Sequence, residues 1–315
     1  MRQNGAHDAM TIVTDVAMTQ QAWLLLAALS VLWGGSFFFV EVALAGLGPL
    51  TVVLGRVGIA AAALIVVVHA RGLRLPTSVR DWRLLAGMAV LNNLVPFSLI
   101  AYGQLQVESG LASIYNATTP LFTVVLAHFF TRTEKLTALK ALGVGFGIAG
   151  VAVLMGPDAL KQVDLVSLAQ IAMLAAALSY AAAGIYGRQL NHLPNSVAAA
   201  GMLAASTVLL LPIAFIAEAP LEYRPGWTVL AAVAGLALLS TAVAYLIYFR
   251  LLAAVGATNL LLVTFLIPLS AIFLGAAFLH ETLGWNAFAG MALIFAGLAA
   301  VDGRLFGATN RRKRN

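Results

Sequence analysis

Residues 22–44 read AWLLLAALSVLWGGSFFFVEVAL, a run of 23 residues in which Glu41 carries the sole charge. A helix that crosses the hydrocarbon core of a bilayer needs about 20 consecutive apolar residues, and this run supplies them. The run is too long for the apolar region of a secretory signal peptide, although residues 43–45 imitate a cleavage site. We therefore predict that residues 22–44 form a retained transmembrane helix.

Apolar segments of similar length recur along the rest of the chain. They cover residues 49–70, 84–104, 109–130, 136–155, 165–186, 197–217, 227–249, 259–279 and 283–301. Of the 315 residues 62% are hydrophobic and 10% are charged, whereas about a quarter of a soluble domain is charged. A membrane β-barrel is excluded, because its strands alternate polar and apolar residues. The predicted fold class is an all-α polytopic membrane protein with ten transmembrane helices.

Basic residues fall almost entirely on one side of this ten-span arrangement. If the N-terminus is cytoplasmic, that side holds fifteen of the 18 Lys and Arg residues, namely Arg2, Arg71, Arg74, Arg80, Arg83, Arg132, Lys135, Lys140, Arg188, Arg250, Arg304, Arg311, Arg312, Lys313 and Arg314. Lys161 and Arg224 fall on the opposite side, and Arg56 lies within a span. Since positive charge concentrates in cytoplasmic loops, both termini are predicted to be cytoplasmic. The net charge of +6 therefore marks a membrane face rather than nucleic-acid binding.

The two halves of the chain resemble each other. Pro120 precedes Glu134 by 14 residues, and Pro268 precedes Glu281 by 13. Offsets of 146 or 147 also align Tyr102 with Tyr248, Gly110 with Gly256, Gly143 with Gly290 and Gly150 with Gly297. Five spans per half place the second copy upside down, an architecture typical of secondary transporters. The predicted divisions are a flexible cytoplasmic tail (1–20), two repeats (21–156 and 157–303) and a basic cytoplasmic tail (304–315).

Several of these features together resemble the EamA-type drug/metabolite transporters. They are the sequence LWGGSF at residues 32–37, Arg56 early in the second span, and Pro120 leading to Glu134 in the fourth, with a weaker copy near Pro268. Within that superfamily the chain is similar to the bacterial ten-span amino-acid exporters, including exporters of aromatic amino acids. The resemblance covers residues 22–301. It implies export of small metabolites across a bacterial plasma membrane by alternating access.

Proline inside a span removes a hydrogen bond to the carbonyl four residues earlier and kinks the helix. Three such prolines are predicted hinges, namely Pro96, Pro120 and Pro268, and Pro212 is a fourth inside a span. The residues four positions before the three hinges are Asn92, Asn116 and Thr264. Their side chains either satisfy the disturbed backbone or face a substrate cavity, and the sequence leaves both readings open.

Aromatic and polar side chains gather in the same spans. The candidate lining of a substrate cavity comprises Trp33, Ser36, Phe37, Asn92, Asn93, Tyr102, Tyr115, Asn116, Tyr180, Tyr245, Tyr248 and Thr264. Aromatic stripes in membrane bundles are usually packing, but a buried tyrosine hydroxyl needs a hydrogen-bond partner. Such a lining would suit a substrate with an apolar side chain and polar ends.

Two charged residues, Glu41 and Arg56, are predicted to lie within the membrane. An intramembrane charge is by default a functional candidate. One interpretation is an ion pair between Glu41 and Arg56 that locks the first two helices together. The alternative is that Arg56 accepts a substrate carboxylate, with Glu41 tuning it or binding the amine. Chains of acidic residues typical of proton relays are absent, so facilitated export or exchange is as credible as proton antiport.

No residue pattern predicts a cofactor, a metal ion or a catalytic centre. The chain has no cysteine, and its five histidines lie far apart in sequence. Residues 145–150 fit the motif G-x-G-x-x-G, but they lie in an apolar span and are interpreted as a helix-packing face. We expect a secondary transporter that exports small zwitterionic metabolites, amino acids first among them. Hydrophobic drugs or other metabolites are the alternative substrates, and a channel or membrane-embedded enzyme is less favoured. The expected partners are a small-molecule substrate and membrane lipid; the oligomeric state stays open, with a monomer slightly favoured.

Overall fold

The computed structural model describes residues 18–131, 134–156 and 164–302, and the regular elements in these ranges are helices. Within them, nine helical segments are long and apolar enough to cross a membrane, and α12 (Val263–Phe278) is a shorter apolar tenth. These segments follow the ten predicted ones in order, which confirms the predicted fold class. Apart from residues 18–20, the predicted tails lie outside the described residues.

The helices divide into two sets of five spans. The first half holds α1 (Gln20–Leu44), α2 (Pro49–Ala70), α3 (Val79–Ala89), α4 (Val95–Gly103), α5 (Ser109–Asn116), α6 (Thr119–Phe130) and α7 (Ala138–Met155). The second half holds α8 (Leu165–Tyr186), α9 (Asn195–Glu218), α10 (Trp227–Ala237), α11 (Ala244–Leu260), α12 and α13 (Trp285–Asp302). Short turns complete the spans: η1 (Val90–Leu94), η3 (Gly187–Leu190), η4 (Pro220–Glu222) and η5 (Leu238–Val243).

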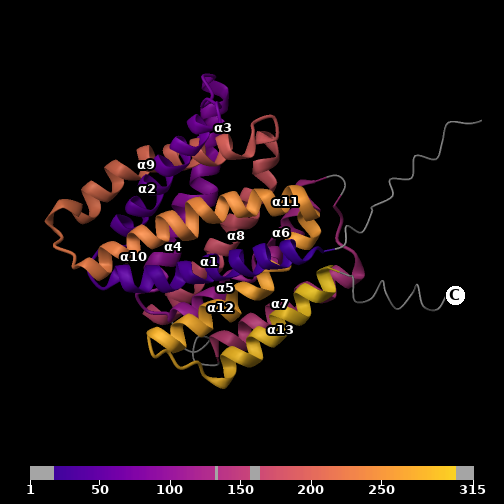
Figure 1. The fold of residues 1–315 in the computed structure, drawn as a ribbon. Coiled ribbons are helices and arrows are strands. Elements are labelled where there is room, and N and C mark those ends of the chain that lie inside the picture. Colours follow the sequence, from indigo (N-terminus) through magenta and orange to yellow (C-terminus); the bar gives the residue numbers. More distant parts are fainter. Residues whose placement is uncertain (1–17, 132–133, 157–163, 303–315) are drawn as a thin grey trace, which may run out of the picture.

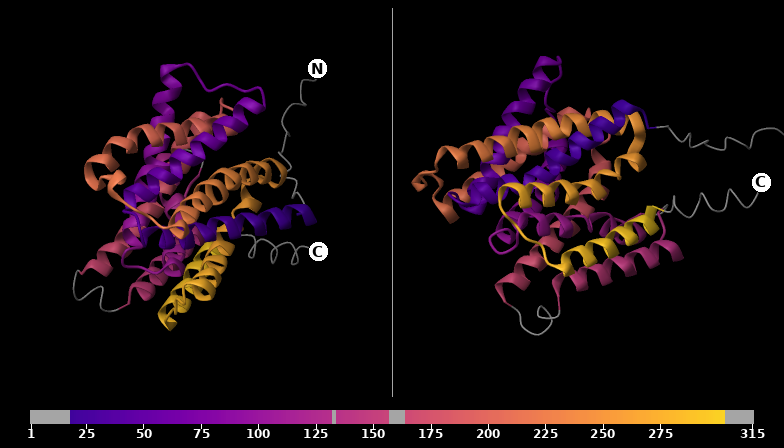
Figure 2. Two further views of the ribbon diagram at one scale, coloured as in Figure 1. Left: turned by 60° about the vertical axis from the view of Figure 1, so that its left-hand side comes forward. Right: turned by 60° about the horizontal axis from the view of Figure 1, so that its bottom comes forward.

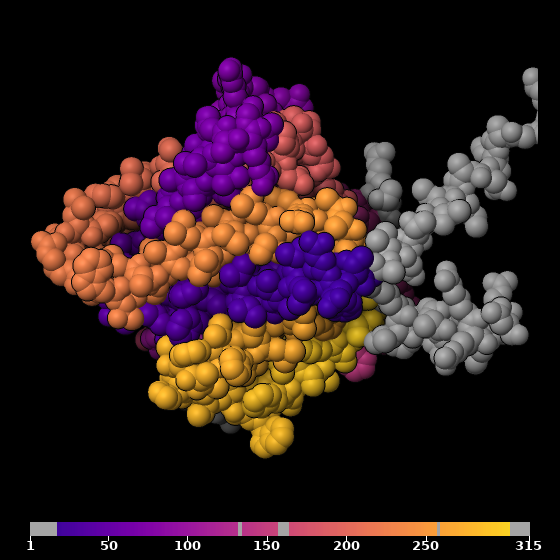
Figure 3. Space-filling view, in the orientation of Figure 1, coloured from indigo at the N-terminus to yellow at the C-terminus, as the bar shows by residue number. Residues whose placement is uncertain are grey.

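Helices of the two halves pack mainly against each other. The main pairs across the halves are α2 with α9, α1 with α12, α4 with α8 and α7 with α13. In Figure 1, α1 runs beside the span formed by α10 and α11. Figure 3 shows the same interleaving on the surface, where α1 lies between helices of the second half. Neither half therefore forms a bundle by itself.

Glycine permits a close contact between α7 and α13, which run alongside each other in the right-hand view of Figure 2. A Cβ atom on Gly150 would lie 2.8 Å from the carbonyl oxygen of Gly290, and one on Gly290 would lie 2.7 Å from that of Gly150. Gly143 meets Gly297 in the same way. Small residues allow backbones to approach in lipid. The interpretation of the glycine-rich segment as a packing face is confirmed, although Gly145 itself faces open space.

The third and fourth spans of each half are irregular at equivalent places. Spans 3 and 8 each contain a π-helical turn, η1 and η5 respectively. An offset of 147 carries η1 onto residues 237–241, which overlap η5. Spans 4 and 9 are interrupted, the first between α5 and α6 and the second between α11 and α12. Such turns inside helices frequently mark functional sites.

The predicted hinge prolines relate differently to these irregularities. Pro96 is the second residue of α4 and follows η1, while Pro120 is the second residue of α6 and follows the interruption of span 4. Pro268 lies inside α12, and the interruption of span 9 precedes it by six residues, at Leu262. Pro212 also lies inside a helix, α9.

Span 8 ends later than predicted. The expected end at residue 249 is wrong, because the helix continues to Gly256, where φ is 76° and ψ is 168°. A positive φ favours glycine, which lacks the Cβ atom that would clash there. Gly256 therefore makes the turn from span 8 into span 9.

The two ends of the bundle carry different charges. In Figure 1 the start of α1 and the end of α13 lie on the same side. Because successive spans cross in opposite directions, that end also holds most described basic residues: Arg71, Arg74, Arg80, Arg83, Lys135, Lys140, Arg188 and Arg250. We call it the basic end. The opposite end, here the acidic end, holds Glu41, Glu108, Glu218, Glu222 and Glu281.

Candidate functional site

Arg56 is the charged residue buried deepest between the helices that the structure describes. It lies in α2 and keeps 8% of its surface exposed. Its guanidinium carbon sits 3.5 Å from the ring centroid of Phe97 in α4, a cation–π geometry. Its Nε donates a hydrogen bond of 3.0 Å to Oγ1 of Thr241 in η5. Arg56 thus joins spans 2, 3 and 8.

Two tyrosines and two asparagines complete this group. Tyr180 packs against Phe97 with ring centroids 6.3 Å apart, and both Tyr180 and Tyr245 lie close enough to Arg56 to interact with its charge. Nδ2 of Asn92 donates to the Tyr245 hydroxyl at 2.9 Å. We call these seven residues the Arg56 group: Arg56, Asn92, Asn93, Phe97, Tyr180, Thr241 and Tyr245.

The π turns explain how neighbouring residues reach different helices. Asn92 and Asn93 are adjacent in η1, yet Asn92 reaches Tyr245 in span 8 while Asn93 donates to Ser206 Oγ in span 7 at 2.8 Å. In η5, Thr241 Oγ1 donates to the carbonyl of Leu236, five residues earlier. Both turns thereby direct polar side chains into the bundle.

The ion pair between Glu41 and Arg56 is not formed, so that expectation is wrong. Glu41 lies toward the acidic end, where its Oε2 accepts a hydrogen bond of 3.2 Å from Gln104 Nε2. Arg56 instead faces Phe97 and Thr241, because its position on α2 turns its side chain toward spans 3 and 8 rather than toward α1. Among the residues that the structure describes, no carboxylate lies within ion-pair distance of Arg56.

The other predicted cavity residues of spans 1 and 8 pack near this group. Trp33 and Tyr248 have ring centroids 5.5 Å apart, and both pack with Tyr180 against one hydrophobic core. Phe37 is buried in the same core, whereas the Ser36 hydroxyl donates to the carbonyl of Trp33 within α1.

The predicted residues of spans 4 and 9 lie at the interruptions of those spans. Tyr115 is fully buried and its hydroxyl has no hydrogen-bond partner among the described residues, and the same holds for Oδ1 of Asn116. Thr264 is the second residue of α12, after the interruption in span 9. Tyr115 shares the core of Trp33 and Tyr248.

Tyr102 does not join the central residues. It is 44% exposed, and its hydroxyl contacts Oε1 of Glu218 at the acidic end, at 3.4 Å. The placement follows from its position near the end of span 3, two turns beyond η1. Its expected place in the cavity is therefore wrong.

Carboxylates at the acidic end bind helix N-termini. Glu281 accepts hydrogen bonds from the backbone N–H groups of Ser109, at 2.8 Å, and Gly110, at 3.0 Å, which begin α5. Glu218 likewise accepts from Leu50 and Thr51, which begin α2. The unpaired N–H groups of a helix start favour such anions.

Glu108 lies beside Glu281 at this acidic end. Partial burial raises the pKa of Glu108, and the negative charge of Glu281 raises it further.

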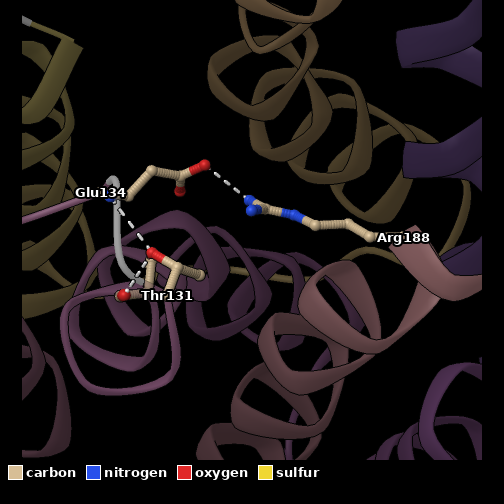
Figure 4. A network of polar contacts seen from close by, with 4 residues as sticks. Thr131, Glu134 and Arg188 are labelled. Carbon is tan, nitrogen blue, oxygen red and sulfur yellow. Dashed lines mark hydrogen bonds and ion pairs between the residues drawn. The ribbon is translucent and has the colours of Figure 1, made fainter.

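The basic end is arranged differently. Glu134, which matches Glu281 in the repeat, forms an ion pair of 2.7 Å with Arg188, and the two side chains are 45% and 47% exposed. Figure 4 shows this pair with Thr131, whose Oγ1 accepts from the backbone N–H of Glu134. Gly256, which matches Gly110, faces open space, whereas a Cβ atom on Gly110 would meet Ile272 and Glu281.

Sequence reasoning missed several partners of these residues. They are Phe97, Gln104, Ser206, Glu218 and Thr241. Glu218 follows the predicted span 197–217 by one residue, so the predicted spans leave it outside the membrane. Ser206 and Thr241 are hydroxyl residues inside apolar spans, a signal that was available, whereas Phe97 carries no signal apart from its place beside Pro96.

Comparison with known proteins agrees with this architecture. Residues 21–156 and 167–301 each match the EamA-like transporter family. The chain is 26% identical over 276 residues to the uncharacterized transporter YoaV of Bacillus subtilis, which covers 86% of this chain and 93% of that protein. It is 27% identical over 260 residues to the uncharacterized inner membrane transporter YedA of Escherichia coli, covering 82% and 83% respectively.

Two further comparisons are more limited. A "probable terminal-alkyne amino-acid exporter" of Streptantibioticus cattleyicolor is 29% identical over 137 residues, which is 44% of this chain and 45% of that protein. A solved crystal structure superposes with a TM-score of 0.63 at 17% identity, covering 90% of this chain and 98% of that one, and it supports the fold alone.

The family match, the apolar spans and the transporter names of the relatives agree with one another. They confirm the predicted membrane location, and YedA is by name an inner membrane protein. With one family unit matching each half of the chain, this multi-pass membrane protein belongs to the EamA-like transporter family.

Proposed function

We propose that the protein is a secondary transporter that exports small zwitterionic metabolites, amino acids first among them, by alternating access. The proposal is carried by the different partners of two glutamates that occupy equivalent positions in the repeat. Glu281 binds the start of α5 at the acidic end, while Glu134 pairs with exposed Arg188 at the basic end. In an inverted repeat, the opposite state is obtained by exchanging the two halves' conformations.

The concentration of basic residues supports a basic end that faces the cytoplasm of a bacterial cell, with both termini on that side. In this orientation the state described here is closed toward the outside. Its partners are the surrounding lipid and a small-molecule substrate, which crosses the plasma membrane chemically unchanged. Opening of the outer end requires Glu281 to release Ser109 and Gly110.

The chemistry of the Arg56 group supports a zwitterionic substrate. A buried cation, amides and phenols offer hydrogen bonds, and Trp33 and Tyr248 offer apolar surface nearby. A substrate with several phosphates would need more intramembrane cations than Arg56 alone. The partial similarity to a named amino-acid exporter agrees with this class.

Counterflow with the purified, reconstituted protein tests the proposal. Vesicles loaded with one unlabelled amino acid are diluted into the same labelled amino acid, across a panel of all twenty. We expect saturable, transient accumulation for a subset with apolar side chains, and none in empty vesicles. Flat traces for every amino acid would refute the substrate class, and accumulation of hydrophobic cations alone would favour a drug exporter.

A further inference from the structure

We propose that Arg56 is the receptor for the substrate's carboxylate, and that Phe97 and Thr241 are positioning residues that aim it. This inference rests on the proposed function and names the chemical group that its central site recognises. It is carried by the burial of Arg56, by the two contacts that hold its side chain, and by the hydrogen-bond donors around it.

Arg56 is a buried cation, and no described carboxylate lies within ion-pair distance of it. A charge removed from water is costly unless it is paired, and breaking such a pair leaves an uncompensated charge inside. The described neighbours of Arg56 are Phe97, Thr241 and the phenols of Tyr180 and Tyr245, and none of them is a carboxylate. A carboxylate that enters between these helices would provide the missing negative charge.

Among the described residues, the two contacts of Arg56 leave its Nη1 and Nη2 atoms without a hydrogen-bond partner. Phe97 covers one face of the plane, and Thr241 takes the Nε–H. A guanidinium has five N–H donors in a fixed fork. The four that remain belong to Nη1 and Nη2, and the edge between these atoms matches the two oxygens of a carboxylate. The contacts therefore orient Arg56 for a bidentate bond.

The π turn η5 makes Thr241 suited to this task. Its hydroxyl proton is used in the bond of 2.9 Å to the carbonyl of Leu236, so its oxygen lone pair points to Arg56 as an acceptor. A hydroxyl fixed as a donor elsewhere cannot turn and compete for the substrate. Tyr245 works in the opposite sense, because it accepts from Asn92 and keeps its own proton to donate. The centre thus presents donors, which suits an anionic group.

The test compares an amino acid with its carboxamide in counterflow, with L-phenylalanine and L-phenylalaninamide as the starting pair. In the wild type we expect the carboxamide to compete at least tenfold more weakly than the acid, which sets the acid-to-amide ratio of competition strength. Arg56→Gln should reduce this ratio to within about twofold, since the positive charge that recognises the carboxylate is gone. Arg56→Lys keeps the charge but not the fork, and should raise the KM for the acid at least tenfold.

The positioning residues are tested with the same ratio, which a merely structural role would not change. Thr241→Val and Phe97→Leu should each lower the acid-to-amide ratio by about fivefold or more, while Thr241→Ser restores it. Arg250→Gln is the matched control, an exposed arginine of span 8 that should leave the ratio unchanged. Thermal unfolding of each purified variant identifies those that fail to fold.

The outcomes separate this inference from the proposed function. Wild-type counterflow of amino acids together with an unchanged ratio in Arg56→Gln would overturn the role of Arg56 and leave the function intact. Inhibition by chloride or acetate as strong as by the amino acid would show an unselective anion site instead. Absence of wild-type counterflow for every amino acid would overturn both. Should Arg56→Gln not fold, an unchanged ratio in Thr241→Val and Phe97→Leu decides against the proposal.

Discussion

Replacing Glu281 by glutamine is expected to lower the rate of counterflow at least tenfold. The carboxylate accepts two backbone hydrogen bonds, of 2.8 Å from Ser109 and 3.0 Å from Gly110. A hydrogen bond to a charged group contributes about 1.5–3 kcal/mol. Glutamine can accept one of the two, so the closed state of the acidic end loses roughly that amount, a shift of about 10- to 150-fold in the equilibrium between the two states. Initial rates of counterflow in vesicles measure the effect.

Glu222→Gln is the matched control for this variant. Glu222 lies in η4 at the same acidic end, is exposed, and binds no helix start. The same change of charge at this position should leave the rate within about twofold of the wild type. Equal losses in Glu222→Gln and Glu281→Gln would attribute the effect to the net charge of that end and contradict a specific role for Glu281.

Replacing Glu134 by glutamine is expected to slow counterflow by a comparable factor, about tenfold or more. Glu134 matches Glu281 in the repeat, so in the opposite state we expect it to bind the start of span 9, just after Gly256. The pair with Arg188 in Figure 4 belongs to the state described here. Initial rates of counterflow, measured alongside thermal unfolding, test this prediction.

Arg188→Gln is the informative comparison, because it breaks the same ion pair and keeps the carboxylate. The two side chains are about half exposed, and exposed ion pairs contribute about 0–1 kcal/mol. The rate in Arg188→Gln should therefore change by about fivefold at most. If the arginine variant loses as much activity as Glu134→Gln, the ion pair itself is what matters, and the equivalence of the two glutamates does not extend to function.

The architecture could be predicted from the sequence because each transmembrane segment must meet a physical requirement within its own residues. A segment that crosses the bilayer needs a certain apolar length, so the ten predicted segments agree with the helices to within a few residues in most cases. The repeat was visible because Pro120, Pro268 and the glutamates after them keep their spacing. The glycines between α7 and α13 indicate a packing face because they recur at a regular spacing inside an apolar span.

The candidate site was only partly predictable, because side-chain partners depend on the rotation of each helix. Glu41 lies three residues before the end of α1 and Arg56 seven residues after the start of α2, yet the two side chains face different neighbours. The π turns change the face of the helix on which the following residues lie. No pattern in residues 90–94 or 238–243 predicts these turns. Consequently the contacts of Thr241 and Phe97 with Arg56 could not be predicted from the sequence, although a hydroxyl residue inside an apolar span is itself a signal.

The absence of cysteine from the sequence allows the central claim of alternating access to be measured directly. Single variants Ser109→Cys, at a buried position of the acidic end, and Ala254→Cys, at an exposed position of the basic end, each introduce one reactive thiol. The rate of labelling by a water-soluble maleimide is compared with and without the additional change Glu281→Gln. Alternating access predicts that Glu281→Gln accelerates labelling at position 109 at least tenfold and slows it at position 254. Acceleration at both positions, or no change at 254, would contradict it.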